Sequence, residues 1–495
     1  MSRRTQGRPS GTAHVDPAYS LEIVVSDDRV DDVARIVAAT PDPVESRELD
    51  HPEGGWARLV LTTDGEHSLG TLQSRLREIL DVHLVYCEDR ALALSRGGKT
   101  QLRATVPLDT AEDLALAYTP GVGRVAQRIA GNPATVDELT GRANRVAVVT
   151  DGSAVLGLGN LGPLAALPVM EAKAALFAHL AGIDAVPICL ATQDVDEIVA
   201  AVTAIAPSFG GINLEDIAAP RCFAIEERLR DSLNIPVVHD DQHGTATVVL
   251  AAMLNALRVV DKSLESARIV VTGAGAAGTA VTRLLLAAGA HDVVVWAPVG
   301  VLHPSLADVL PPHKRWLVRH TNPRGVHGGL EAALTGADAV IGVSAPGVLN
   351  YALISKMAVN PIVFALANPV PEVDPDEVMD LVSVIATGRS DYPNQVNNAL
   401  VFPGLFRGAL GTSATALNED VFVACANALA ALTTPPHPEQ LLPDVLDPRV
   451  VPAVADAVTR TLTQTDPRLS HHGALQRDDV DTQNELHSGK EEGDG

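Results

Sequence analysis

The chain has 495 residues, 46% of them hydrophobic and only 3% aromatic, and 61 acidic against 37 basic side chains give a formal net charge of −24. This length is enough for about three domains with sizeable cores, which excludes a chain that is disordered throughout. Strong acidity repels phosphate groups and argues against nucleic acids or anionic membrane surfaces as partners. We therefore expect chemistry on small molecules.

The two ends of the chain differ in composition from the middle. Residues 1–16 contain arginines but no apolar segment, so they resemble neither a secretory signal nor a membrane span. Residues 466–495 are polar, with more acidic than basic side chains, and we expect disorder at both ends. The four cysteines form no CxxC pair, which fits a reducing compartment, and no run of 18 apolar residues occurs. These features predict a cytoplasmic protein without a membrane anchor.

Residues 17–96 are expected to form a small separate domain. Their hydrophobic pattern predicts strands at 19–25, 56–63, 82–87 and 91–95, with helices at 29–39 and 68–80. This mixture is typical of a small α+β domain of the ACT-like, ferredoxin-related kind. Such a domain could bind a regulatory ligand or serve only in dimerisation and packing, and the pattern leaves both open.

From residue 97 onwards, continuous apolar runs alternate with helical segments. The first set of runs covers 145–150, 184–190 and 236–239, and the second covers 267–273, 292–296, 338–343 and 361–366. Runs of this kind are typical of parallel strands buried on both faces. We therefore predict an α/β fold with two tandem doubly wound domains, over 97–245 and 246–465. Helical stretches at 416–434 and 447–462 are expected to cover a sheet face.

The pattern GxGxxG occurs twice, and only the second copy has the context of a dinucleotide site. Its glycines follow an apolar strand directly and open an unbroken helix, whose first amides can receive a pyrophosphate. The first copy, at 157–162, is interpreted as a tight turn that lines a cleft, or as plain loop geometry. The second copy consists of Gly273, Gly275, Ala276, Ala277 and Gly278.

The strand after the second glycine loop lacks the acid that would bind the ribose 2′-hydroxyl of NAD. It ends at Trp296 and Ala297, and no Arg or Lys stands there to favour the 2′-phosphate of NADP. The choice between NAD and NADP therefore stays open.

Two pairs of carboxylates are expected at the C-terminal ends of neighbouring βα units of the first α/β domain. Glu215 and Asp216 form one pair, and Asp240 and Asp241 form the other. Carboxylates at neighbouring strand ends suit a hard divalent cation such as Mg²⁺ or Mn²⁺. The alternative is that Asn213 and Asp216 form an N-cap pair while the other two acids charge a helix start.

A lysine and a tyrosine complete the set of candidate catalytic residues. Lys173 lies among apolar helical neighbours, where desolvation would lower its pKa and suit it to act as a base; the alternative is a stem whose ammonium reaches water. Tyr118 precedes a Pro-Gly turn, where a phenol can donate a proton or simply pack as an aromatic.

These segments occur in an order that resembles the bacterial malic enzymes, which decarboxylate malate with NAD(P). The similar motifs are AYTPGV, LGLGNLGPLAALPVMEAK, GGINLEDIAAPRCF, VHDDQHGTA, VTGAGAAG, GVSAPGVL, FALANPVPE and YPNQVNNALVFPG. The resemblance covers about residues 97–465, and residues 19–95 look like the ACT-type extension of some family members.

The resemblance implies a role for each candidate residue. Lys173 would accept the C2-hydroxyl proton of (S)-malate, and Tyr118 would protonate C3 after CO₂ has left. Glu215, Asp216 and Asp241 would bind Mg²⁺ or Mn²⁺, with Asp240 beside them. Loop 273–278 would bind the pyrophosphate of NAD or NADP, and amides on the substrate and nicotinamide side would come from Asn368, Asn397 and Asn398.

Two other functions remain as alternatives to an oxidative decarboxylase of malate. One is an amino-acid dehydrogenase of similar build, which needs no metal cluster. The other is a metabolite-sensing protein that has lost turnover. The resemblance also suggests at least a homodimer, with a possible small-molecule effector at the ACT-like domain.

Overall fold

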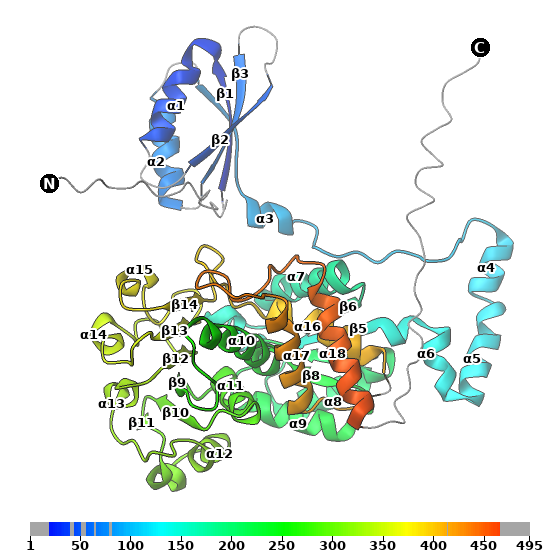
Figure 1. Cartoon of the computed structure of the whole chain (residues 1–495). Helices are drawn as coiled ribbons and strands as arrows, with labels where there is room; N and C mark the ends of the chain where they lie inside the picture. Colours follow the sequence, from blue (N-terminus) through cyan, green and yellow to red (C-terminus); the bar gives the residue numbers. More distant parts are fainter. Residues whose placement is uncertain are drawn as a thin grey trace.

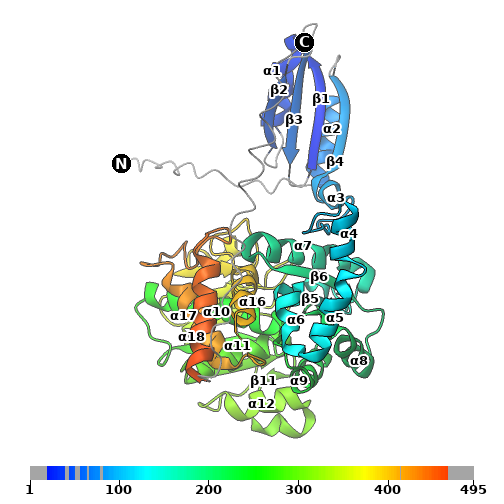
Figure 2. The same ribbon diagram turned by 90° about the vertical axis from the view of Figure 1, so that its right-hand side faces the viewer.

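The structure is a computed structural model that describes residues 19–39, 44–50, 56–63, 66–78, 82–412 and 414–465. The expected disordered ends, 1–16 and 466–495, lie outside the described residues. Figure 1 shows a small domain above a larger body, and Figure 2 shows the same two parts from the side, joined through α3.

The small domain is an antiparallel sheet in the order β2-β3-β1-β4 with two helices. Alternate residues of β1, namely Leu21, Ile23 and Val25, are buried in its core, as the period of a half-buried strand requires. This is the ferredoxin-like arrangement of strands and helices. The elements are β1 (Tyr19–Ser26), α1 (Val30–Ala38), β2 (Val44–Asp50), β3 (Trp56–Thr63), α2 (Glu66–Leu76), β4 (Val82–Asp89) and α3 (Arg90–Ser95).

Two sequence predictions in this domain were wrong. Residues 91–95 belong to helix α3 rather than to a strand, because the side chain of Asp89 accepts a hydrogen bond from the Leu92 amide and caps a helix start. Strand β2 was not predicted, because its sequence VESRELD is rich in charge. It forms the edge of the sheet, where charged residues are common.

A segment with little packing connects the small domain to the body. Just after α3, the Lys99 amide donates to Glu171 on α7, and the Lys99 ammonium donates to Ser95 at 2.8 Å. The chain then runs to a pair of helices that stand out from the side of the body in Figure 1. The elements are α4 (Ala111–Ala117), α5 (Gly121–Gly131), η2 (Pro133–Thr135), α6 (Val136–Leu139) and η3 (Gly141–Asn144).

The first α/β domain has a four-stranded parallel sheet in the order β6-β5-β7-β8. Strand β7 was not predicted, because its four residues, GINL, are too short for a clear apolar run. The elements are β5 (Arg145–Thr150), η4 (Val155–Gly157), α7 (Pro163–Ala181), β6 (Asp184–Cys189), α8 (Val195–Ile205), η5 (Ala206–Ser208), β7 (Gly211–Leu214), α9 (Arg221–Ser232), β8 (Val237–His239) and α10 (Asp240–Val259).

The second α/β domain has five parallel strands in the order β10-β9-β12-β13-β14, with the short β11 antiparallel at the edge. The elements are β9 (Arg268–Thr272), α11 (Ala276–Ala287), β10 (Asp292–Ala297), β11 (Gly300–Val301), η6 (Pro304–Val309), α12 (Pro312–His320), α13 (Leu330–Leu334), β12 (Ala339–Gly342), α14 (Tyr351–Ile354), β13 (Ile362–Ala365), α15 (Pro375–Val378), β14 (Val384–Thr387), η7 (Asn398–Leu400), α16 (Phe402–Leu410), α17 (Glu419–Ala431) and α18 (Val450–Thr465).

One large core joins the two α/β domains. Helix α10 runs between them and packs against α11 and α17, and α18 packs against α16 and α17. Phe177 on α7 contacts the rings of Phe402 and Phe406 on α16, so the last helices tie the second domain to the first. The predicted α/β class with two parallel, doubly wound sheets is confirmed.

Helix α7 alone, among the described helices, is long and apolar enough to cross a membrane by length and composition. It packs against β5, β6 and α16 and contributes Phe177 to the core, so its composition has an explanation within the fold.

Each sheet has a point where the connections reverse direction, and ligands bind beside such points in open α/β sheets. In the first sheet this point lies between the ends of β5 and β7, and in the second between the ends of β9 and β12. The carboxylate pair at Glu215 follows β7, and the glycine loop at Gly273 follows β9. The fold therefore places both predicted sites where ligands are expected.

Candidate active site

Three predicted metal ligands come together at the end of the first sheet. Each of Glu215, Asp216 and Asp241 offers one carboxylate oxygen, and these oxygens lie within 4.8 Å of one another. The Asp216 amide donates to the Asp241 carboxylate at 2.8 Å, which connects the loop after β7 to the first turn of α10. The structure thus assembles the predicted cluster from two elements.

The four carboxyl groups here have unusually high pKa values. Burial raises the pKa of Glu215 to about 7, although Lys173 opposes the rise, and burial together with the charges of Asp241 and Glu215 raises the pKa of Asp216 to about 8. Burial also raises the pKa of Asp240 to about 6 and that of Asp241 to about 6, although Lys173 opposes the rise in both. The positive charge that the protein itself supplies here is too small to balance four buried carboxylates.

The residues present fit a divalent cation. The ligand set is all oxygen, as Mg²⁺ and Mn²⁺ prefer, and Asp216 Oδ2 is buried without a hydrogen-bond partner. The alternative that these acids only charge a helix start is correct in part, since Asp240 and Asp241 do begin α10. Asn213, however, donates to Glu215 at 2.9 Å and caps no helix with Asp216.

Lys173 lies beside this cluster and is nearly fully buried. Its ammonium is 2.6 Å from a Glu215 oxygen, donates to Asp240, and lies 4.3 Å from the centre of the Phe402 ring. The predicted lowering of its pKa is wrong for the cation-free protein. Burial does lower the pKa, but Asp240, Glu215 and Asp241 raise it more, so the net shift is upward.

Asp240 connects the lysine to the amides of the second domain. Its side chain is completely buried and accepts from Lys173 and from Asn398, whose amide nitrogen is 2.6 Å away. The other predicted amide of this pair, Asn397, accepts from the Ala399 amide and caps η7. The structure therefore places Asn398 at the cluster, whereas the Asn397 side chain caps a short helix of its own segment.

Asn368 lies exposed at the end of the second sheet, next to the first glycine-rich turn. A Cβ atom on Gly157 would collide with the Asn368 carbonyl oxygen, so backbone from the two domains meets here. Gly157 also has φ +76°, which favours glycine. The interpretation of residues 157–162 as a turn at a cleft agrees with this close approach.

The second glycine loop has the geometry of a dinucleotide site. Gly273 has φ +113°, and a Cβ on it would collide with the Val343 carbonyl oxygen after β12. A Cβ on Gly278 would in turn collide with the Gly273 carbonyl oxygen. Helix α11 begins at Ala276, so its first amides face the loop and can bind phosphate oxygens.

Tyr118 is the one predicted catalytic residue that makes no hydrogen bond with this arrangement among the described residues. It ends α4, its side chain is 67% exposed, and its hydroxyl has no hydrogen-bond partner among the described residues. Within a single chain, the candidate active site therefore has its metal ligands and lysine but no tyrosine.

Sequence reasoning missed two residues that hold the loops of the cluster. Asp151 follows β5, is completely buried, and pairs with Arg221 at 3.1 Å; it also accepts from the Ser153 amide. Arg221 begins α9, and its Nε is buried without a partner. The signal was present, since Asp151 is a polar residue directly after an apolar strand, as are Glu215 and Asp240.

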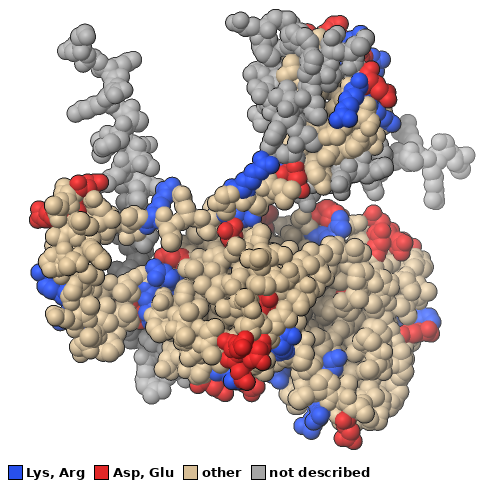
Figure 3. Space-filling view, turned by 180° about the vertical axis from the view of Figure 1, so that it is seen from behind, with Lys and Arg blue, Asp and Glu red and all other residues tan. Residues whose placement is uncertain are grey.

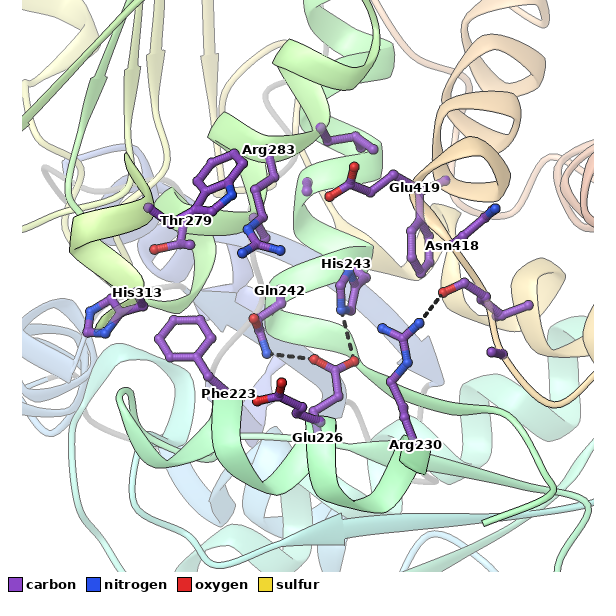
Figure 4. Close-up of a pocket in the computed structure, with 18 of the residues that line it drawn as sticks. Phe223, Glu226, Arg230, Gln242, His243, Thr279, Arg283, His313, Asn418 and Glu419 are labelled. Carbon is purple, nitrogen blue, oxygen red and sulfur yellow. Dashed lines mark hydrogen bonds and ion pairs between the residues drawn. The ribbon is translucent and has the colours of Figure 1, made fainter. Parts of the chain in front are cut away.

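A larger cavity of about 1040 Å³ lies apart from this cluster, between α9, α10, α11, α12 and α17. Figure 4 shows Glu226 at its floor, where it accepts from Gln242 at 3.0 Å and pairs with His243 at 2.8 Å. Arg283 projects into it with its guanidinium over the Trp316 ring. None of the predicted catalytic or metal-binding residues lines this cavity.

The raised carboxyl pKa values predict how the stability of the protein depends on pH and metal. Without a cation, the folded state binds more protons than the unfolded chain, in which these groups titrate near their model values of 3.8 and 4.5. The free energy of unfolding therefore falls as the pH rises through the folded pKa values. Because Mn²⁺ would neutralise the excess charge, we expect it to raise Tm more at about pH 8 than at about pH 6.

Thermal unfolding by circular dichroism, with Mn²⁺ or with a chelator, measures this difference. The variant Asp216→Asn serves as the matched control, because it removes one charge and one ligand. It should raise Tm of the cation-free protein at the higher pH and lose most of the Mn²⁺ effect. An equal Mn²⁺ effect at both pH values, or one that survives in Asp216→Asn, would contradict the site.

Comparison with known proteins assigns the chain to a family. Models of the "Malic enzyme, N-terminal domain" and "Malic enzyme, NAD binding domain" match residues 97–230 and 242–463. The NAD-dependent malic enzyme of Geobacillus stearothermophilus is 50% identical over 392 residues, which is 79% of this chain and 82% of the relative. The NADP-dependent malic enzyme of Halomonas elongata is 45% identical over 407 residues, which is 77% of this chain and 95% of the relative.

A solved structure agrees with these matches. The NAD-dependent malic enzyme from Thermotoga maritima superposes with a TM-score of 0.72 and 46% identity, over 74% of this chain and 98% of that chain. The small domain lies outside both family matches, so its ACT-like character stays a prediction. The matches and the geometry lead to one conclusion: the chain belongs to the malic enzyme family.

Proposed function

We propose that the chain carries out the oxidative decarboxylation of malate at the cluster of Lys173, Glu215, Asp216, Asp240 and Asp241. Family membership supports the reaction itself, with NAD or NADP as oxidant and pyruvate and CO₂ as products. The observation that supports this site most is the burial of the Lys173 ammonium between two carboxylates, directly beside a set of oxygen ligands.

Glu215, Asp216 and Asp241 would hold Mg²⁺ or Mn²⁺. The cation would supply Lewis-acid stabilisation of the negative charge that develops as CO₂ leaves, and NAD or NADP would supply the acceptor for the hydride from C2. The protein's contribution is to fix three ligands from two elements within 4.8 Å of one another.

Lys173 is the proposed base for the C2-hydroxyl proton. In the cation-free protein, the neighbouring carboxylates hold its proton and its pKa is raised. If Glu215 and Asp241 held a divalent cation, their negative charge would act less strongly on the lysine, and burial would favour the neutral amine with mainly Asp240 left to oppose it. Metal binding and activation of Lys173 are therefore coupled through the same carboxylates.

Asp240 and the two amides position the lysine and the ligands. Asp240 orients the Lys173 ammonium and is itself fixed by Asn398, which comes from the second domain. Asn368 lies open at the cleft and is proposed to contact substrate and nicotinamide, while loop 273–278 binds the pyrophosphate. Tyr118 is the proposed acid that protonates C3 of enolpyruvate.

We also propose a cytoplasmic location and at least a homodimer, on the basis of composition and family membership. The small domain is proposed to bind a small-molecule effector, since it is a separate unit outside both malic enzyme matches. The metal-ligand cluster favours malate oxidation over amino-acid oxidation, which needs no such cluster. The buried Lys173 beside that cluster favours catalysis over a role in sensing alone.

The role of Lys173 can be tested against a second lysine that only stabilises the fold. Lys173→Ala should lower malate-dependent NAD(P)H formation by about 10²-fold to 10⁴-fold, because the base is lost. Lys262→Ala is the matched control. The Lys262 ammonium lies 2.7 Å from an Asp338 oxygen, and neither residue belongs to the proposed site. The rate is followed by absorbance with Mn²⁺ present. Near-normal turnover in Lys173→Ala would remove this lysine from the mechanism.

The contact between Gly157 and Asn368 can be tested with two alanine variants. Gly157→Ala places a Cβ against the Asn368 carbonyl, while Gly159→Ala has the same left-handed φ, at +90°, but no atom within 4 Å. Both variants carry the same backbone strain, so their difference reports the contact with Asn368. We expect kcat/KM for malate to fall about ten-fold further in Gly157→Ala. Equal losses in the two variants would mean that Asn368 is not positioned by this contact.

The adenosine side of the cofactor site predicts weak discrimination between NAD and NADP. Ala297 ends β10 without a carboxylate, and the nearby cavity of about 550 Å³ is lined by neither Asp, Glu, Lys nor Arg. We therefore expect kcat/KM values for NAD and NADP within about ten-fold of each other. Malate-dependent assays with both cofactors side by side measure this ratio, and a hundred-fold preference would point to a residue elsewhere.

A further inference from the structure

Glu372 is a completely buried acid that the proposed reaction does not use. Figure 3 shows Asp and Glu side chains at the surface of the body seen from behind, where water can solvate them. Glu372 differs, because it is 0% exposed and pairs with no Lys, Arg or His among the described residues. A buried carboxylate is tolerated only where other groups satisfy it. The partners of Glu372 therefore indicate its role.

The Glu372 carboxylate accepts hydrogen bonds from two loops of the second sheet. One of its oxygens accepts from the Ser344 amide at 2.7 Å and from the Ser344 hydroxyl at 3.2 Å. The other oxygen accepts from the Ala367 amide at 2.9 Å. Hydrogen bonds to an ionised acceptor are stronger than those between neutral groups. A single side chain therefore joins the loop after β12 to the loop after β13.

The two loops begin where β12 and β13 stop pairing with each other. The strands are in register up to Gly342, and a bond from the Leu366 amide to the Gly342 carbonyl at 3.0 Å continues the pairing by one residue. The amides of Ser344 and Ala367 lie beyond this bond and donate to Glu372 instead. Because buried amides need acceptors, the carboxylate replaces the ladder at the point where the strands separate.

Both loops border the proposed cofactor site. Asn368, which is proposed to contact the nicotinamide, directly follows Ala367. Ser344 lies against the pyrophosphate loop, since its hydroxyl is 3.1 Å from that of Thr272 and its Cα would lie 3.4 Å from a Cβ on Gly273. Ligands of open α/β sheets bind at the carboxyl ends of strands beside such a reversal point. Glu372 thus holds the backbone on two sides of this site.

The structure leaves space for this carboxylate at Gly342. A Cβ on Gly342 would lie 2.5 Å from the carboxyl carbon of Glu372 and 2.8 Å from each of its oxygens. Gly342 is not among the glycines with positive φ, so its backbone conformation does not demand glycine. The close approach of the carboxylate is therefore what requires a residue without a side chain here.

The contacts of Glu372 assign it a role in cofactor binding. We propose that Glu372 is a positioning residue, which fixes the loops of Ser344 and Asn368 at the separation that NAD or NADP needs. This inference rests on the proposed assignment of the cofactor to loop 273–278 and Asn368. Since Glu372 is fully buried, it acts through the two backbone amides and does not touch the cofactor.

Two acid-to-amide variants at opposite ends of the same sheet test this role. Glu372→Gln replaces one acceptor oxygen with an amide donor, so either the Ser344 amide or the Ala367 amide loses its acceptor. Asp338→Asn is the matched control. Asp338 lies directly before β12, at the other edge of the sheet, and accepts from the Arg268 amide at 2.8 Å.

Both variants should lower Tm, but only Glu372→Gln should weaken cofactor binding. NADH binding, followed by fluorescence without malate or metal, should give a Kd about ten-fold above that of the wild type, and KM for NAD and NADP should rise similarly. The Mn²⁺ concentration needed for half-maximal activity should stay unchanged. Asp338→Asn should keep the wild-type Kd. A Glu372→Gln variant that loses Tm but binds NADH as tightly as Asp338→Asn has only a structural role, which overturns the proposal.

Glu372→Asp takes the place of Glu372→Gln if the latter does not fold. It keeps the negative charge but is one methylene shorter, so it cannot reach both amides in the same way. The Kd for NADH should again rise, and a wild-type value overturns the proposal.

The binding assay also separates this inference from the proposed function. A wild-type protein that binds NADH but does not oxidise malate would count against the proposed function. The NADH affinities of the wild type, Glu372→Gln and Asp338→Asn would still decide whether Glu372 positions the cofactor loops.

Discussion

The excess of buried negative charge around Lys173 is the constraint on which the rest of the site depends. Four carboxyl groups gather at the end of the first sheet around one ammonium, which pairs with Glu215 and Asp240, and their raised pKa values indicate that one lysine does not balance them. A buried charge is tolerated only when it is paired or binds a cation. The same imbalance therefore supports the proposed metal site, and it accounts for the raised pKa of Lys173 in the protein without metal.

The fold supplies this arrangement by placing strand ends together. The loops after β5 and β7 and the first turn of α10 meet at the reversal point of the first sheet, and α7 brings Lys173 beside them. The second domain closes the site with Asn398, which bonds to Asp240, and with Asn368, whose backbone abuts Gly157. The site is thus an interdomain structure, and each domain holds only part of it.

Most of the α/β architecture and the residues of the cluster could be predicted from the sequence, because long apolar strands and the acids after them are local signals. The pKa shift of Lys173 could not, because the helix shows only its apolar neighbours, while the carboxylates that reverse the shift come from β7 and α10. Strand β7 was too short to recognise, and residues 91–95 formed a helix because a cap at Asp89 outweighed their strand-like pattern. The exposure of Tyr118 could not be predicted either, since the residues around it do not reveal how much of the segment other elements cover.

The link between the small domain and α7 has a mechanical consequence. The Lys99 amide donates to Glu171, and the Lys99 ammonium donates to Ser95 at the end of α3, so one residue bridges the small domain and the body. Glu171 stands two positions before Lys173 on the same rigid helix. A displacement of α3 would therefore reach, through Lys99 and Glu171, the helix that carries Lys173, at a point about half a helical turn from that residue.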